Sequence, residues 1–128
     1  MTTQGELTEC PRCGTRADLH APGRCLDVWI ADLLGWQEVG MVPWYSEALS
    51  PAWDLIVLLA VMRMEVRTLV EAGVVHVTVE PTGHGPCIRA ALRDAEPNRA
   101  WCGAVAMAAL RAMVTWPERL AEFVEDRP

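Results

Sequence analysis

The chain has 128 residues, the length of one domain, and 52% of them are hydrophobic, so it can bury a core without supporting disulfides. Its net charge is −6, and its eleven basic residues are all arginine. This balance excludes the dense positive surface that duplex nucleic acid requires and every mechanism based on lysine. The start of the chain is polar and acidic, unlike a signal peptide, and the apolar run from Leu55 to Met62 is much shorter than the ~20 residues of a membrane span. We expect a cytoplasmic protein that does not bind membranes.

The first 23 residues differ from the rest, because they are polar and show no hydrophobic period. We therefore divide the chain into a cysteine-containing extension (1–23), a compact domain (24–116) and an acidic tail helix (117–128).

A pattern of metal ligands, C-x2-C-x6-H-x4-C, starts in the extension and ends just after it. Its residues are Cys10, Cys13, His20 and Cys25. A C-x2-C turn places two thiolates on one ion, and a third thiolate with an imidazole completes the tetrahedron of a structural zinc site. The pattern resembles a zinc knuckle with a longer loop, but the loop lacks the aromatic residues with which knuckles bind single-stranded nucleic acid. The alternatives are an unfolded leader with free thiols and a redox-active CxxC pair, which lacks its usual βαβ context here. We expect Cys87 and Cys102 to be small buried residues.

Apolar residues recur at helical spacing over 25–34, and Gly35 suits a helix C-terminal cap, so we predict a helix there. The stretch 36–45 alternates loosely and predicts short strands or an irregular edge.

Ser50 and Pro51 are a typical helix start. We expect this second helix to run to about Glu71, with Gly73 just past its end. Its centre is apolar all round, which favours burial by a sheet and another helix, or by a second subunit.

Two alternating segments, 74–80 and 87–93, flank a turn at 81–86 and predict a hairpin. Matching their apolar faces sets the register, with Thr78 opposite Arg89 and His76 opposite Ala91. The polar face then carries a row formed by His76, Thr78, Arg89 and Arg93.

A last long helix follows at about 99–115, with Asn98 as its cap, and Pro117 separates it from the tail. Its many alanines allow close packing, so it is a second candidate for a dimer interface. The element order, α-β(β)-α-β-β-α, predicts an α/β (α+β) sandwich in which helices cover a small antiparallel sheet.

Three stretches occur in a familiar order: GRCLDVWIADLLGW (23–36), PWYSEALSPAWDLI (43–56), and HVTVEPTGHGPCIRAAL leading into RAWCGAVAMAAL (76–110). Together they resemble the phage ABA sandwich domain, a family of bacteriophage and prophage proteins. The resemblance implies an α/β sandwich. It also implies similarity to the anti-Thoeris sponge proteins, oligomers that capture cyclic ADP-ribose-type signals and cyclic oligonucleotides at subunit interfaces without cleaving them. This inference rests on the fold, and no ligand residue is carried over.

Two features are candidates for ligand binding. Arginine forks bind phosphates, so the row with His76, Arg89 and Arg93 suits a nucleotide, or else it is a solvated face. Trp44 and Tyr45 are placed to stack a base, or else they pack inside the protein. The sequence shows no base–nucleophile pair and no carboxylate cluster, so we expect no enzyme activity. We predict a homo-oligomer that sequesters a small cyclic nucleotide; the alternative is a zinc-stabilised module for protein–protein interaction.

Overall fold

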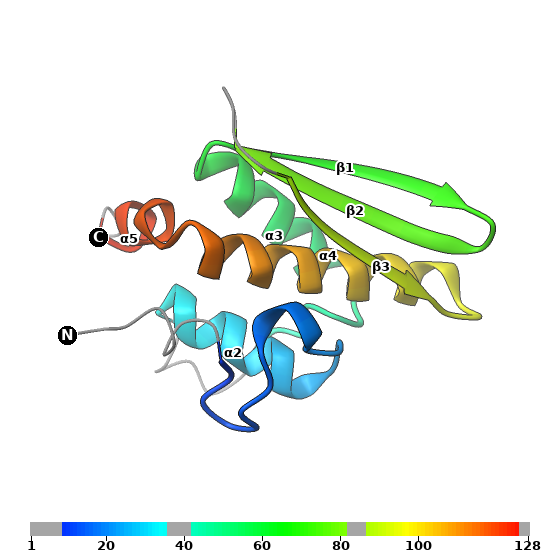
Figure 1. The fold of residues 1–128 in the computed structure, drawn as a ribbon, viewed down its shortest axis with the longest axis horizontal. Coiled ribbons are helices and arrows are strands. Elements are labelled where there is room, and N and C mark those ends of the chain that lie inside the picture. The colour runs from blue at the N-terminus through cyan, green and yellow to red at the C-terminus, as the bar shows by residue number, and fades with distance from the viewer. Residues whose placement is uncertain (1–8, 36–41, 82–86, 126–128) are drawn as a thin grey trace.

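The computed structural model describes residues 9–35, 42–81 and 87–125. They form an α+β fold in which a three-stranded sheet lies on one layer of helices and a second helical layer lies beneath (Figure 1). This confirms the predicted fold class. The elements in chain order are η1 (Ala17–Leu19), α2 (Arg24–Leu34), α3 (Leu49–Val61), β1 (Met64–Glu71), β2 (Val74–Pro81), β3 (Ile88–Arg93), α4 (Pro97–Thr115) and α5 (Pro117–Glu125).

The sheet is antiparallel in the order β1-β2-β3. Thr78 pairs with Arg89 and His76 with Ala91, so the predicted hairpin register is confirmed. The valines at 75, 77 and 79 are buried against α4, and the alternate residues of β2 face outward. In the part of the chain that Figure 1 draws as ribbon, no helix covers this outer face.

Helix α4 lies at the centre of the molecule, between the sheet and α2 (Figure 1). Its alanines, together with Gly103, let neighbouring elements approach closely on several sides, and thirteen of its residues are buried. These alanines therefore pack within the chain itself, and the prediction that this helix forms a dimer interface stays a prediction. Its cap also differs, because the Glu96 side chain accepts a hydrogen bond from the Asn98 backbone N–H and the helix begins at Pro97.

The second helix ends ten residues earlier than predicted. Helix α3 stops at Val61, and a turn at Met62 and Arg63, where φ is 65° at Arg63, leads into β1. The β-branched residues at alternate positions 66, 68 and 70 favour a strand, a signal that the prediction of one long helix did not use. Gly73 belongs to the β1–β2 turn, where its φ is 78°.

Three smaller predictions also have outcomes. The predicted helix at 25–34 is confirmed as α2, and Gly35 caps it in the left-handed conformation. Residues 42–45 form no strand but lead into a turn, and 36–41 lie outside the described residues. Cys102 is buried as expected, whereas Cys87 is exposed, which corrects the prediction for that residue.

Candidate metal centre

The C-x2-C pair lies in a tight turn before η1. The Gly14 N–H donates to the Cys10 carbonyl at 2.8 Å, and the Cys10 N–H donates to the Thr15 carbonyl at 2.9 Å. Gly14 has a φ of 77°, a left-handed conformation that glycine adopts without strain. The turn directs both thiols toward the start of α2, where Cys25 lies in the first turn.

The four predicted ligands come together. Their ligand atoms all lie within 4.8 Å of one another. The Cys10 and Cys25 sulfurs are 3.6 Å apart, and the Cys13 sulfur is 3.5 Å from His20 Nε2. Zinc–ligand bonds of about 2.0–2.3 Å in a tetrahedron separate the ligand atoms by about 3.4–3.8 Å. The Cys10–Cys25 and Cys13–His20 pairs are therefore at the separation found in a Cys3His zinc site, and the other pairs lie within 4.8 Å.

The orientation of His20 suits a metal ligand. Its Nδ1 lies 2.8 Å from the Ala21 carbonyl oxygen, so Nδ1–H donates and Nε2 is left with its lone pair toward Cys13. A second hydrogen bond of this kind is what usually fixes the tautomer of a zinc-bound histidine. The ring is buried and lies 5.6 Å from the Trp29 ring of α2.

The thiols differ in their acidity. The hydrogen bond with Thr15 lowers the pKa of Cys13 to about 6, whereas burial raises the pKa of Cys25 to about 12. A Cys3His zinc site binds three thiolates, so the half-buried Cys25 thiol would need a cation beside it to lose its proton near neutral pH.

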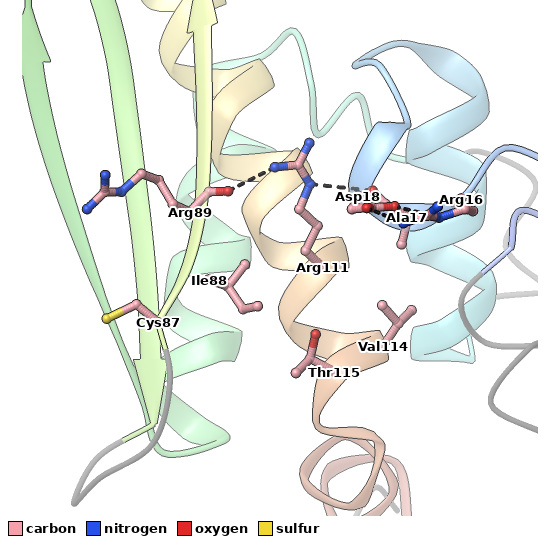
Figure 2. Close-up of a pocket in the computed structure, with 9 residues that line it drawn as sticks. All are labelled: Arg16, Ala17, Asp18, Cys87, Ile88, Arg89, Arg111, Val114 and Thr115. Carbon is pink, nitrogen blue, oxygen red and sulfur yellow. Dashed lines mark hydrogen bonds and ion pairs between the residues drawn. The ribbon is translucent and has the colours of Figure 1, made fainter.

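The cluster of four candidate ligands is linked to the rest of the protein through η1. The Arg111 side chain of α4 donates to the Ala17 carbonyl at 3.4 Å and to the Arg89 carbonyl at 2.8 Å. Figure 2 shows Arg111 crossing from α4 between η1 and β3, in a groove of about 480 Å³. The side chains of Arg89 and Cys87 point to the other side of β3, so they do not approach Arg111.

The predicted arginine row lies on the outer face of the sheet. His76 is half-buried, while Arg89 and Arg93 are exposed and form no ion pair within the described segments. Arg67 joins this face opposite Thr78 and lies 3.3 Å from Glu80. Sequence reasoning missed Arg67 because it placed that residue in a helix.

Trp44 and Tyr45 do not join the row, because they pack against α2, on the other side of α4. The Arg24 guanidinium lies over the Trp44 ring at 4.2 Å. Because Tyr45 is buried, its ring has no free face for a ligand in this structure. The same burial raises the pKa of Tyr45 to about 12. Of the predicted base-stacking pair, only Trp44 is exposed.

Polar residues near Trp44 and Tyr45 join the two sequence stretches 23–36 and 43–56. The Ser46 N–H donates to Asp27 Oδ1 at 2.9 Å, and the Gly23 N–H donates to the Ser46 hydroxyl at 3.1 Å. Arg24 Nη1 donates to the Pro43 carbonyl and lies 3.6 Å from the buried Asp27 carboxylate. The GRCLD and PWYS stretches therefore bind each other, and their role in this structure is to join α2 to the segment before α3.

Comparison of the chain with protein-family models, curated proteins and solved structures gives no match. The resemblance to phage ABA sandwich domains therefore stays a prediction. Among the described residues, no helix has the length and apolar character needed to cross a membrane.

Proposed function

We propose that this protein is a non-catalytic binding module whose N-terminal segment is held in place by one structural zinc ion. The observation that carries the proposal is the convergence of Cys10, Cys13, His20 and Cys25 within 4.8 Å. Four protein ligands close the coordination shell of zinc, whereas a catalytic zinc keeps one position for water or substrate. Such a site supplies folding energy and no chemistry.

The position of the cluster supports this role. It joins the turn at 10–15 to the first turn of α2, and it lies next to η1, which contacts α4. Bound zinc would therefore fix η1 against the centre of the domain. Because Cys13 is exposed and Cys10 is buried, the ion would lie at the surface with its protein side shielded.

Metal analysis of the untagged protein, purified without chelator, tests the proposal. We expect one zinc ion per chain by native mass spectrometry and by elemental analysis. Cys13→Ser should lose the metal, and Cys87→Ser, which changes an exposed thiol outside the cluster, should retain it. A wild-type protein without metal, also after incubation with zinc, would refute the proposal.

A second candidate function is the capture of a small nucleotide on the outer face of the sheet. It is favoured by Arg89 and Arg93, two exposed guanidinium groups without acidic partners among the described residues. Arginine binds phosphate oxygens bidentately, so such a pair suits the phosphates of a cyclic dinucleotide or of an ADP-ribose derivative. A phage protein that sequesters a host defence signal would use a site of this kind.

Thermal shift and calorimetry with cyclic nucleotides test this candidate. We expect binding that weakens by roughly tenfold or more in Arg89→Ala and Arg93→Ala, with the ligand recovered intact after heat denaturation. Arg99→Ala, at the start of α4, is the matched control. Equal affinities in all four proteins, or recovery of a cleaved product, would contradict capture at this face.

A further inference from the structure

Exposed apolar side chains gather on two neighbouring elements. Of the eight large hydrophobic residues that are strongly exposed in the described segments, six belong to α3 and β1. We call them the α3–β1 surface: Leu49, Trp53, Val57, Val61, Leu69 and Val70, of which Leu69 lies on the outer face of the sheet and Val70 on the face toward the helices. The Trp53 ring also lies 6.3 Å from Trp101 of α4, whose indole N–H donates to the Thr68 hydroxyl of β1. The two elements are therefore bound together at this surface.

The exposed residues of α3 form one ridge. Leu49, Trp53, Val57 and Val61 follow each other at intervals of four residues, while Ala52, Leu55 and Leu59 are buried on the opposite side. Asp54 is the one charged residue of this helix. A helix that faces water normally carries a charged outer face, and an apolar ridge with four-residue spacing is the feature that packs into a groove on another helix.

Strand β1 is an edge of the described sheet and lies on the same side of the molecule. It has eight residues with neither proline nor glycine. Natural proteins protect such edges with charged residues, prolines, bulges or covering elements, because an open edge pairs with other strands. Strand β1 has charged residues at 65, 67 and 71 but no proline. Helix α3 packs under β1, whereas α4 packs under β2 and β3, so α3 and the open edge face outward together (Figure 1).

We propose that a second copy of this chain covers the α3–β1 surface in a two-fold symmetric dimer. The two β1 strands would pair antiparallel into a continuous sheet, and the two α3 ridges would pack against each other below it. A two-fold axis brings the same surface of each chain together, so one contact covers both the apolar ridge and the open edge. This inference is independent of the zinc proposal.

The charges of β1 together with Leu69 select the register. With the two-fold axis at Leu69, Arg67 lies opposite Glu71 of the partner subunit, twice, and the Leu69 side chains meet each other. An axis at Val66 also pairs opposite charges, because it places Glu65 opposite Arg67 of the partner subunit, but only an axis at Leu69 also brings the two exposed Leu69 side chains together. An axis at Thr68 would instead place Glu65 opposite Glu71 of the partner subunit, and an axis at Arg67 would pair two arginines; like charges opposite each other destabilise a sheet. Glu71 is exposed and has no ion pair within the described segments.

Analytical ultracentrifugation and light scattering of the full chain test the dimer. We expect a species with twice the 14.1 kDa mass of the chain. Trp53→Glu and Val57→Glu should each give a folded monomer, since both positions are exposed and the charge would lie in the contact. Leu19→Glu, which changes an equally exposed apolar residue outside this surface, should remain dimeric.

Charge exchange tests the register. Glu71→Arg should weaken dimerisation by roughly tenfold, because each Arg67 would then face an arginine. Adding Arg67→Glu to it should restore the wild-type dissociation constant. A monomeric wild type that binds lipid vesicles or another protein instead, or a dimer that Trp53→Glu leaves intact, would overturn the proposal. A double variant that is weaker than Glu71→Arg alone would overturn the register.

Discussion

The buried carboxylate of Asp27 provides the sharpest test of how the second helical layer is assembled. Its side chain is 0% exposed, and Oδ1 accepts the Ser46 N–H, whereas Oδ2 has no hydrogen bond among the described residues and faces Arg24 at 3.6 Å. Asp27→Ala would leave the Ser46 N–H buried without an acceptor, which costs about 1–3 kcal/mol. It would also remove a negative charge from the first turn of α2, worth about 0.3–1 kcal/mol.

We therefore expect Asp27→Ala to lower the free energy of unfolding by about 1.5–4 kcal/mol, measured by urea denaturation followed by circular dichroism. Asp27→Asn keeps an oxygen acceptor for Ser46 and should lose less. Asp32→Ala, on the same helix and without a side-chain hydrogen bond in the described structure, is the control. The reasoning would be refuted if Asp27→Ala and Asp32→Ala had equal effects.

The pH dependence of the free energy of unfolding, compared between wild type and Asp27→Asn, tests the contribution of the Asp27 charge. Burial raises the pKa of Asp27 above its ordinary value of 3.8, against the opposing effects of Ser46 and Arg24. The folded state therefore binds the proton more tightly than the unfolded state, and this contribution to stability is full below 3.8 and lost as the pH rises through the folded-state pKa. On acidification toward pH 4, wild type should gain stability relative to Asp27→Asn. A difference that stays constant with pH would contradict this assignment.

Three further predictions concern contacts between the layers. Removing the metal with a chelator should lower the thermal midpoint and speed amide exchange in residues 9–22, while α4 stays protected; uniform exchange along the chain would contradict a local role. Gly103→Ala should destabilise the protein by about 1 kcal/mol despite the better helix propensity of alanine. The added Cβ would lie 2.5 Å from Leu92 Cδ2 and 3.2 Å from Pro22 Cβ. The loss of stability should therefore be smaller in a Leu92→Ala background. Arg111→Met should cost about 1–3 kcal/mol in urea denaturation by removing the hydrogen bonds to η1 and β3, and Arg89→Met, an exposed arginine, should be nearly neutral.

The sequence predicted the parts of this fold whose signals are local. Strict alternation over 74–80 fixed both the strand and its register, because one face had to be apolar. The ligand spacing predicted the Cys3His cluster, since the short loop between Cys10 and Cys13 can close only into a turn. The left-handed conformation of Gly35 was likewise predictable from its place after an apolar helical run.

The end of α3 was not predictable in the same way. The run from Leu55 to Val61 is apolar on every face, so it carries no helical period whose end could mark the end of the helix, and no proline or glycine separates it from the strand that follows. What ends the helix is the left-handed turn at Arg63, a residue whose type gives no signal for that conformation. The error also hid Arg67 and the open edge of β1, which become visible only once that segment is a strand.

Trp44 and Tyr45 show why aromatic residues in a loop are ambiguous. Their sequence context is the same whether they bind a ligand or pack on a neighbour, and the neighbour that decides the matter, Arg24, is twenty residues away in the chain. The contacts of Arg24 with the Val42 and Pro43 carbonyls supply the missing link. Long-range polar contacts of this kind have no periodic signature that a sequence pattern could detect.

The sheet with α4 forms one half of the molecule, and the N-terminal segment with α2 forms the other. Substitutions in the two halves should change the free energy of unfolding independently. One apolar core joins the sheet, α4 and α2, and the N-terminal segment is held in addition by the cluster of Cys10, Cys13, His20 and Cys25, and α2 by the Asp27–Ser46 contact. Effects of changes in separate regions normally add. Cys25→Ser and Val77→Ala should therefore be additive in their effect on the free energy of unfolding. Gly103 is different, because it touches both Pro22 and Leu92, so Gly103→Ala should couple energetically with a change in either half.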